Sequence, residues 1–156
     1  METDVALKFY SNQHEKKLNE FELPSEQEKF TSLPSAMGEV QKGQYRIVIL
    51  QDNEPVGFFL LHATKRVQEY TDNPHAMLLT ALSIDYKQQG KGIAKKSMNQ
   101  LPAFVREEFP GCDQVVLAVN HRNIAAQMVY KRVGFTDSER RIEGPIGEQY
   151  VYVKNI

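Results

Sequence analysis

The sequence has little of what marks secreted, membrane-spanning or nucleic-acid-binding proteins. Its single cysteine, Cys112, excludes a disulfide within the chain and favours a reducing compartment. No apolar run approaches the ~20 residues of a membrane helix, and the first residues lack the pattern of a secretion signal. The 19 basic and 20 acidic side chains leave no positive excess to attract nucleic acid. We therefore expect a cytoplasmic protein that binds neither membranes nor nucleic acid.

The chain also lacks low-complexity tracts, internal repeats and linker-like segments. Its 156 residues, of which 41% are hydrophobic, suffice for one core and are too few for two domains of ordinary size. We therefore predict that residues 1–156 form a single domain.

Strand-like and helix-like segments alternate along the chain. We predict strands over residues 5–10, on both sides of the turn at 51–55, and over 76–85, 112–120, 135–142 and 149–154. We predict helices over residues 15–21, 25–30, 34–41, 93–105 and 123–133. In the last of these, Ile124, Met128 and Val129 are expected to form the buried face. This order predicts an α/β (α+β) fold, with a mixed sheet covered by helices.

Two glycines join the strand at 76–85 to the helix that follows it. A helix N-terminus carries partial positive charge and free N–H groups, and Gly90 and Gly92 allow an anion to approach the backbone. Lys91 and Lys95 add positive charge, and Ala94 is small. The segment is either a phosphate-binding loop or a tight turn with exposed lysines. A Walker A pattern is absent, and Lys95 replaces the third glycine of a dinucleotide-binding loop.

Two motifs resemble the GNAT acetyltransferase family. Residues 89–94, QGKGIA, match the family pattern [QR]-x-x-G-x-[GA]. A second pattern, N-x-x-A-x-x-x-Y-x-x-x-G-F, is reproduced by Asn123, Ala126, Tyr130, Gly134 and Phe135. The resemblance covers nearly the whole chain, although residues 11–44 match only in character. It implies a mostly antiparallel central sheet of about six to seven strands.

The resemblance implies direct transfer of an acetyl group from acetyl-CoA to an amine, without a metal. The pantetheine is expected to lie between the strand 76–85 and the strand that ends at Asn120, with a bulge near Leu82 or Ser83 that directs an N–H at the thioester oxygen. The residues implied in cofactor binding are Leu82, Ser83, Ile84, Gln89, Gly90, Lys91, Gly92, Ile93, Ala94, Lys95, Asn123, Ala126 and Tyr130. Asn123 is also a good helix N-cap.

The resemblance assigns Tyr130 as the acid that protonates the leaving thiolate, because a phenol of pKa about 10 is protonated near neutral pH. Many relatives carry a glutamate in the strand before the loop, but residues 77–84, MLLTALSI, contain no carboxylate. Deprotonation of the amine is left to water or to Glu26, His62, His75 or His121. The sequence favours none of these four.

The acceptor side is expected to be acidic. Residues 1–40 carry a net charge of −4 and the remainder carries +3. This asymmetry is consistent with a cationic acceptor, either a small molecule such as a polyamine or a peptide amine, and equally with solvated helix faces. Three further possibilities stay open: a non-catalytic acyl-CoA sensor, transfer of a longer acyl group, and a homodimer.

Overall fold

The computed structural model describes residues 5–28, 30, 31, 33 and 40–156. The predicted helix at 34–41 lies almost entirely outside these residues. The strands are β1 (Val5–Phe9), β2 (Gln44–Gln51), β3 (Glu54–His62), β4 (Ala76–Ile84), β5 (Gln114–Asn120), β6 (Thr136–Gly144) and β7 (Gly147–Asn155). The helices are α1 (Glu15–Asn19), α2 (Ser25–Glu28), α3 (Ile93–Glu108) and α4 (Ile124–Arg132), and the 3-10 turns are η1 (Asn12–His14), η3 (Lys65–Glu69) and η4 (Tyr86–Gln88).

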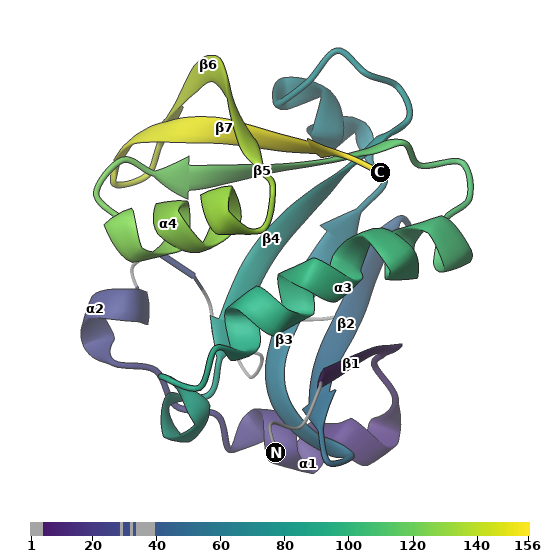
Figure 1. Ribbon diagram of the computed structural model, residues 1–156, viewed down its shortest axis with the longest axis vertical. Coiled ribbons are helices and arrows are strands. Elements are labelled where there is room, and N and C mark those ends of the chain that lie inside the picture. The colour runs from purple at the N-terminus through teal and green to yellow at the C-terminus, as the bar shows by residue number, and fades with distance from the viewer. Residues whose placement is uncertain (1–4, 29, 32, 34–39) are drawn as a thin grey trace.

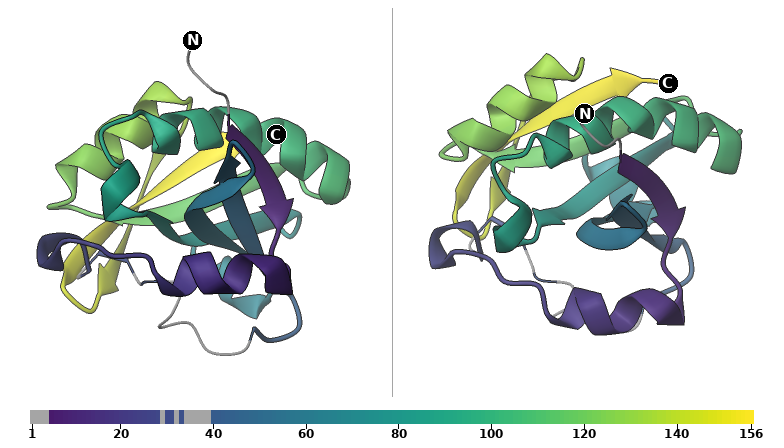
Figure 2. Two further views of the ribbon diagram at one scale, coloured as in Figure 1. Left: turned by 90° about the horizontal axis from the view of Figure 1, so that it is seen from below. Right: turned by 60° about the horizontal axis from the view of Figure 1, so that its bottom comes forward.

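All seven strands belong to one sheet, in the order β1-β2-β3-β4-β5-β7-β6. Every neighbouring pair is antiparallel except β4 and β5, which run parallel. Helices α3 and α4 cover one side of the sheet, and α1 lies on the other (Figure 2). The predicted mixed, mostly antiparallel sheet flanked by helices is confirmed.

Strands β4 and β5 pair over only part of their length. Their register runs from Ala76 opposite Gln114 to Leu79 opposite Leu117 and stops there. The rest of β4 stays paired with β3, whereas β5 stays paired with β7 as far as Asn120. The two strands consequently diverge (Figure 1), and the facing edges of β4 and β5 carry backbone groups that no strand pair uses.

A β-bulge interrupts β4 just where this divergence begins. Thr80 is opposite Leu60 and Ser83 is opposite Phe58, so two residues of β4 face one residue of β3. Within the bulge Ala81 has a φ of 59°, which is uncommon for a residue with a side chain. The bulge predicted near Leu82 or Ser83 is therefore present.

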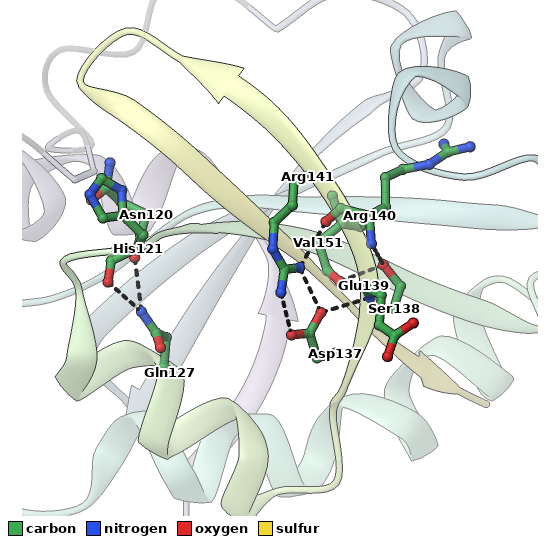
Figure 3. Close-up of polar contacts among 9 residues, drawn as sticks. All are labelled: Asn120, His121, Gln127, Asp137, Ser138, Glu139, Arg140, Arg141 and Val151. Atoms are coloured by element: carbon green, nitrogen blue, oxygen red, sulfur yellow. Dashed lines mark hydrogen bonds and ion pairs between the residues drawn. The ribbon is translucent and has the colours of Figure 1, made fainter.

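The exposed face of α4 differs from the predicted one. Ile124 and Met128 are 57% and 49% exposed, so the assignment of these two to the buried face is wrong, and Val129 is half-buried. The buried side chains are Gln127 and Tyr130. Gln127 donates two hydrogen bonds of 3.1 Å to backbone carbonyls at the end of β5 (Figure 3). These bonds fix the rotation of the helix, and hydrophobicity alone did not predict it.

Strand β6 is broken by a wide bulge. Asp137 is opposite Tyr152 and Arg141 is opposite Tyr150, so three residues of β6 face one of β7. Arg141 donates two hydrogen bonds of 2.8 Å to the Asp137 carboxylate (Figure 3), and these bonds hold the pKa of that carboxyl below its usual range. The N–H of Glu139, whose φ is 70°, donates to the same carboxylate at 2.8 Å. The ion pair therefore closes the bulge and supports a strained backbone position.

Neither a membrane span nor a metal cluster is found in the part of the chain that the structure describes. No helix there is long and apolar enough to cross a membrane. Among the same residues, no group of three or more His, Cys, Asp or Glu side chains is arranged to hold a metal ion.

Gly57 allows β3 to pack closely against the bulged end of β4. A Cβ at this position would lie 2.7 Å from Cδ1 of Ile49, 2.8 Å from Cδ1 of Ile84 and 3.1 Å from the carbonyl oxygen of Ser83. We predict that Gly57→Ala lowers the free energy of unfolding by about 1–3 kcal/mol through overpacking. Urea unfolding measures this change. Gly111→Ala is the matched control, because a Cβ there meets no atom within 4 Å; equal losses in the two variants would contradict the prediction.

Candidate active site

The predicted phosphate loop lies between η4 and α3. Gly90 and Gly92 have φ values of 81° and 72°, in the left-handed region that favours glycine. Gly92 is also the N-cap of α3. A Cβ on either glycine would meet no atom of the protein within 4 Å. The glycines are therefore required by backbone conformation, and the space beside them is open.

The first turn of α3 presents backbone amides beside this loop. Lys96 N–H donates to the carbonyl of Gly92 at 3.0 Å, so the amides of residues 93–95 precede the first such bond and have no partner within the helix. Ile93 is buried and anchors the turn in the core, whereas Lys91 and Lys95 are exposed. The dipole of a 16-residue helix adds positive potential at this end. The predicted residues 89–95 thus meet in one anion-attracting turn.

The Gln89 side chain hydrogen-bonds the glycine loop to two neighbouring segments, β4 and α2. Its Nε2 donates to the carbonyl of Ile84 at 2.9 Å and to Oε1 of Gln27 at 2.8 Å. Gln27 Nε2 donates back to Gln89 Oε1 at 3.1 Å. The side chain of Gln89 is therefore hydrogen-bonded both to the end of β4 and to α2. Sequence reasoning missed Gln27, because nothing in the local pattern of α2 indicates a partner 62 residues away.

A second connection joins the same two regions. The N–H of Glu22 donates to Oδ1 of Asp85 at 3.1 Å, and the N–H of Tyr86 donates to the carbonyl of Glu22 at 2.8 Å. Asp85 is 2% exposed. The segment between α1 and α2 is thus fixed to the start of the loop.

The predicted β4 residues lie along the part of the strand that has separated from β5. Leu82 and Ile84 are half-buried and pack against the core under α3. Ser83 is 4% exposed, and among the described residues its hydroxyl has no hydrogen-bond partner. Whether these residues contact a cofactor stays a prediction.

Tyr130 lies in the same core cluster as Leu82, Ile84 and Ile93. It is 8% exposed, and its ring packs edge-to-face on Phe135 with 5.6 Å between centroids. Burial raises the pKa of Tyr130 above its ordinary value, so the phenol keeps its proton at neutral pH. Its hydroxyl makes no hydrogen bond to any residue that the structure describes. The group is thus protonated and available as a donor.

Asn123 is the N-cap of α4. Its Oδ1 accepts a hydrogen bond of 3.3 Å from the N–H of Ala126, which is half-buried against the core. The predicted capping role is confirmed. The cofactor contacts of Asn123 and Ala126 remain predictions.

Among the three candidate histidines, His62 is the most buried. It is 1% exposed, and its Nε2 lies 2.6 Å from Oγ1 of Thr80. Burial, together with the charge of Arg66, lowers the pKa of His62 to about 4. The imidazole is therefore neutral at physiological pH and is a weak acceptor for the proton of an alkylammonium ion.

The other candidate bases are less well placed. His75 is exposed and precedes β4, at the opposite end of that strand from the glycine loop. The Nδ1–H of His121 donates to the carbonyl of Glu148 at 2.9 Å. The side chain of Glu26 lies outside what the structure describes. The structure therefore singles out no side chain as the base.

Comparison with known proteins agrees with this geometry. The model of the Acetyltransferase (GNAT) family matches residues 8–135. YbbJ of Bacillus subtilis (strain 168), described as an uncharacterized N-acetyltransferase, is 46% identical over 155 residues, which cover 97% of each chain.

Two solved structures show the same fold. Aminoglycoside acetyltransferase AAC(6')-Ib, in complex with coenzyme A and kanamycin, has a TM-score of 0.77 at 18% identity and covers 97% of this chain and 95% of its own. RimL, a ribosomal L7/L12 alpha-N-protein acetyltransferase in complex with coenzyme A, has a TM-score of 0.73 at 16% identity, with 99% and 96% covered. The family match and the relative at 46% identity carry the assignment. The chain belongs to the GNAT family of acetyltransferases.

Proposed function

We propose that the chain, acting as one domain of residues 1–156 in the cytoplasm, transfers the acetyl group of acetyl-CoA directly to an amine. The observation that supports the proposal is that the left-handed glycine loop follows β4, and that Tyr130 belongs to the core cluster against which Leu82 and Ile84 of β4 pack. The family match and the N-acetyltransferase relative support the same reaction. A homodimer is part of the proposal and rests on the family resemblance.

The proposed cofactor path follows the separated edge of β4. The pyrophosphate accepts hydrogen bonds from amides of residues 89–95, where the helix dipole favours negative charge. The pantetheine then lies beside residues 82–84 as an added strand, with Asn123 and Ala126 on the α4 side. The bulge leaves an N–H near Leu82 to stabilise the oxyanion that develops on the thioester. In support, the two solved structures named above contain coenzyme A on the same fold.

The proposed reaction exchanges one bond for another. The amine nitrogen forms a bond to the thioester carbon, the C–S bond breaks, and the electron pair of that bond stays on sulfur. Tyr130 then gives its proton to the sulfur and regains one from solvent, while the amine loses its proton to water. A phenol, with a pKa of about 10, is a weaker acid than a thiol, with about 8.5, and burial raises the pKa of Tyr130 further. The sulfur becomes basic enough to take this proton only as the C–S bond breaks and negative charge builds on it. We therefore place the proton transfer after C–S cleavage has begun.

The proposed acceptor is cationic, a polyamine-like small molecule or a peptide amine. Exposed Glu15, Glu20 and Glu22 belong to α1 and the segment after it, on the side of the sheet opposite α3 and α4. These carboxylates favour a positively charged ligand on that side. The relatives include one enzyme solved with kanamycin and one named for a protein α-amine, so both acceptor types occur on this fold.

We predict that the protein releases CoA thiol from acetyl-CoA in the presence of at least one member of a panel of spermidine, kanamycin and lysine-bearing peptides. Tyr130→Phe should lower kcat by roughly 10²-fold, because a general acid typically contributes that much. Wild-type activity should not fall through the loss of this acid at pH 9, because burial raises the pKa of Tyr130 and keeps the phenol protonated there. Calorimetry of CoA binding is the control, and affinity should not change. Full activity in Tyr130→Phe would exclude Tyr130 as the acid, and CoA binding without any transfer would favour a sensor.

Gly92→Val should weaken CoA binding at least roughly tenfold, because the side chain enters the open space beside the loop and strains a left-handed position. The strain itself should cost about 1–2 kcal/mol of unfolding free energy. Calorimetric titration with CoA measures the affinity, and thermal unfolding shows that the variant is folded. Gly111→Val, outside the loop, should bind CoA normally. An unchanged dissociation constant in Gly92→Val would refute the loop assignment.

A further inference from the structure

Thr80 occupies the point where the two halves of the sheet separate. Leu79 makes the last pair with β5, opposite Leu117, and Thr80 is the next residue. The bulge follows at once, with Ala81 at a φ of 59°. Thr80 is half-buried, so part of its side chain remains accessible to a ligand. The backbone of Thr80 therefore lies at the closed end of the gap in which the pantetheine is proposed to run.

The alternation of β4 side chains assigns Thr80 to one side of the sheet. Met77 and Leu79 pack in the core under α3. Leu78 packs instead with Val67 of η3, and Ala81 packs against the cluster that contains residues of α1. Thr80 follows Leu78 in this alternation, so it faces the α1 side. The phosphate loop and Tyr130 lie with α3 and α4, which leaves the α1 side for the acceptor.

The Thr80 hydroxyl has a fixed partner. His62 Nε2 lies 2.6 Å from Thr80 Oγ1, whereas His62 Nδ1 is buried and has no hydrogen-bond partner among the described residues. A buried N–H without a partner is rarer in proteins than a buried acceptor without one. The proton of the neutral ring is therefore on Nε2, and this N–H donates to Thr80 Oγ1. A second lone pair of Oγ1 is left for a ligand.

From this juxtaposition we propose that Thr80 Oγ1 accepts a hydrogen bond from an N–H of the acceptor amine, and that His62 is the positioning residue that holds the hydroxyl in place. The inference rests on the proposed acetyl transfer. A primary amine has one lone pair and two N–H groups, so holding one N–H directs the lone pair at the thioester carbon. The N–C bond then forms and the C–S bond breaks, while Thr80 and His62 keep their own protons. Such orientation is an established source of rate acceleration.

The environment of His62 supports positioning in preference to proton transfer. Burial and Arg66 lower the pKa of His62 to about 4, so the ring stays neutral while an alkylammonium ion, with a pKa about six units higher, keeps its proton. Because a neutral imidazole has a single N–H, and that N–H is on Nε2, His62 is always the donor in its hydrogen bond to Thr80. The pair is therefore suited to orient an amine that arrives deprotonated.

The first test compares Thr80→Val with Thr80→Ser, using spermidine, kanamycin and a lysine-bearing peptide as amine probes. Thr80→Val should lower kcat/KM for the amine roughly 10²-fold, as misplacement of a reactant does, and leave the KM for acetyl-CoA within about twofold. Thr80→Ser keeps the oxygen and should restore most of the activity. Transfer by Thr80→Val at the wild-type rate, with normal CoA binding, would overturn this inference and leave the proposed function intact. If the wild-type protein did not bind CoA, that result would instead contradict the proposed function.

The second test separates orientation from stability. His62→Gln keeps an N–H donor near the position of Nε2 and should retain activity, whereas His62→Leu should lose it. The double variant Thr80→Val/His62→Leu replaces both polar partners and should recover the melting temperature lost by the single changes without recovering transfer. Recovery of transfer in the double variant would show a purely structural role.

A third measurement does not depend on the acceptor. Nitrogen-15 NMR of the histidine rings should show His62 neutral at pH 7, with its proton on Nε2. A proton on Nδ1 would contradict the proposed direction of the Thr80 bond and overturn the positioning role. The assignment of the His62 signal follows from its loss in His62→Gln.

Discussion

The short parallel pairing of β4 and β5 is the constraint on which the rest of this structure depends. Four pairs, ending at Leu79 and Leu117, hold the two halves of the sheet together. Beyond them each strand keeps its other neighbour, so neither half loses its own support. Backbone groups left over along the gap need partners from water or from a ligand. A narrow, extended ligand that carries its own amide groups, such as pantetheine, can supply such partners.

This gap divides the molecule into two chemical sides. On one side, α3 supplies a positive helix terminus and α4 supplies a buried phenol within the same apolar cluster. On the other, α1 and the segment at Glu22 carry carboxylates. Hydrogen bonds connect the two sides near the glycine loop. One pair of residues is Gln27 and Gln89, and the other is Glu22 and Asp85. The segment at Glu22 and helix α2 are thus hydrogen-bonded to the glycine loop and to the residue that precedes η4.

The sequence predicted those features that depend on local patterns. The strand segments, the turn at 51–55 and the glycine turn between β4 and α3 each follow from a few neighbouring residues, and the structure has all of them. The paired motifs also placed Tyr130 and Asn123 on α4. Local sequence patterns gave a wrong prediction where contacts between distant residues determine the structure. The rotation of α4 depends on Gln127 and the end of β5, so Ile124 and Met128 were assigned to the wrong face.

Two other features could not be foreseen for the same reason. Gln27 meets Gln89 across 62 residues, and His62 meets Thr80 across 18. Neither pair has a spacing signature, because strand order and the bulge bring them together. A lone histidine in a strand is usually structural. His62 differs in two respects: its Nδ1 has no hydrogen-bond partner among the described residues, and its Nε2 contacts Thr80, the residue at which β4 separates from β5.

The bulge in β6 has a consequence for how this protein meets other copies of itself. β6 is an outer strand of the sheet, and an outer strand exposes a row of backbone groups that can pair with another chain. Here the row is interrupted by a bulge with two extra residues, which the Asp137–Arg141 ion pair closes, and the strand carries charged side chains. A second sheet cannot align along such an edge. Continuation of the sheet into another copy is therefore disfavoured at β6, which leaves β1 as the outer strand at the opposite edge.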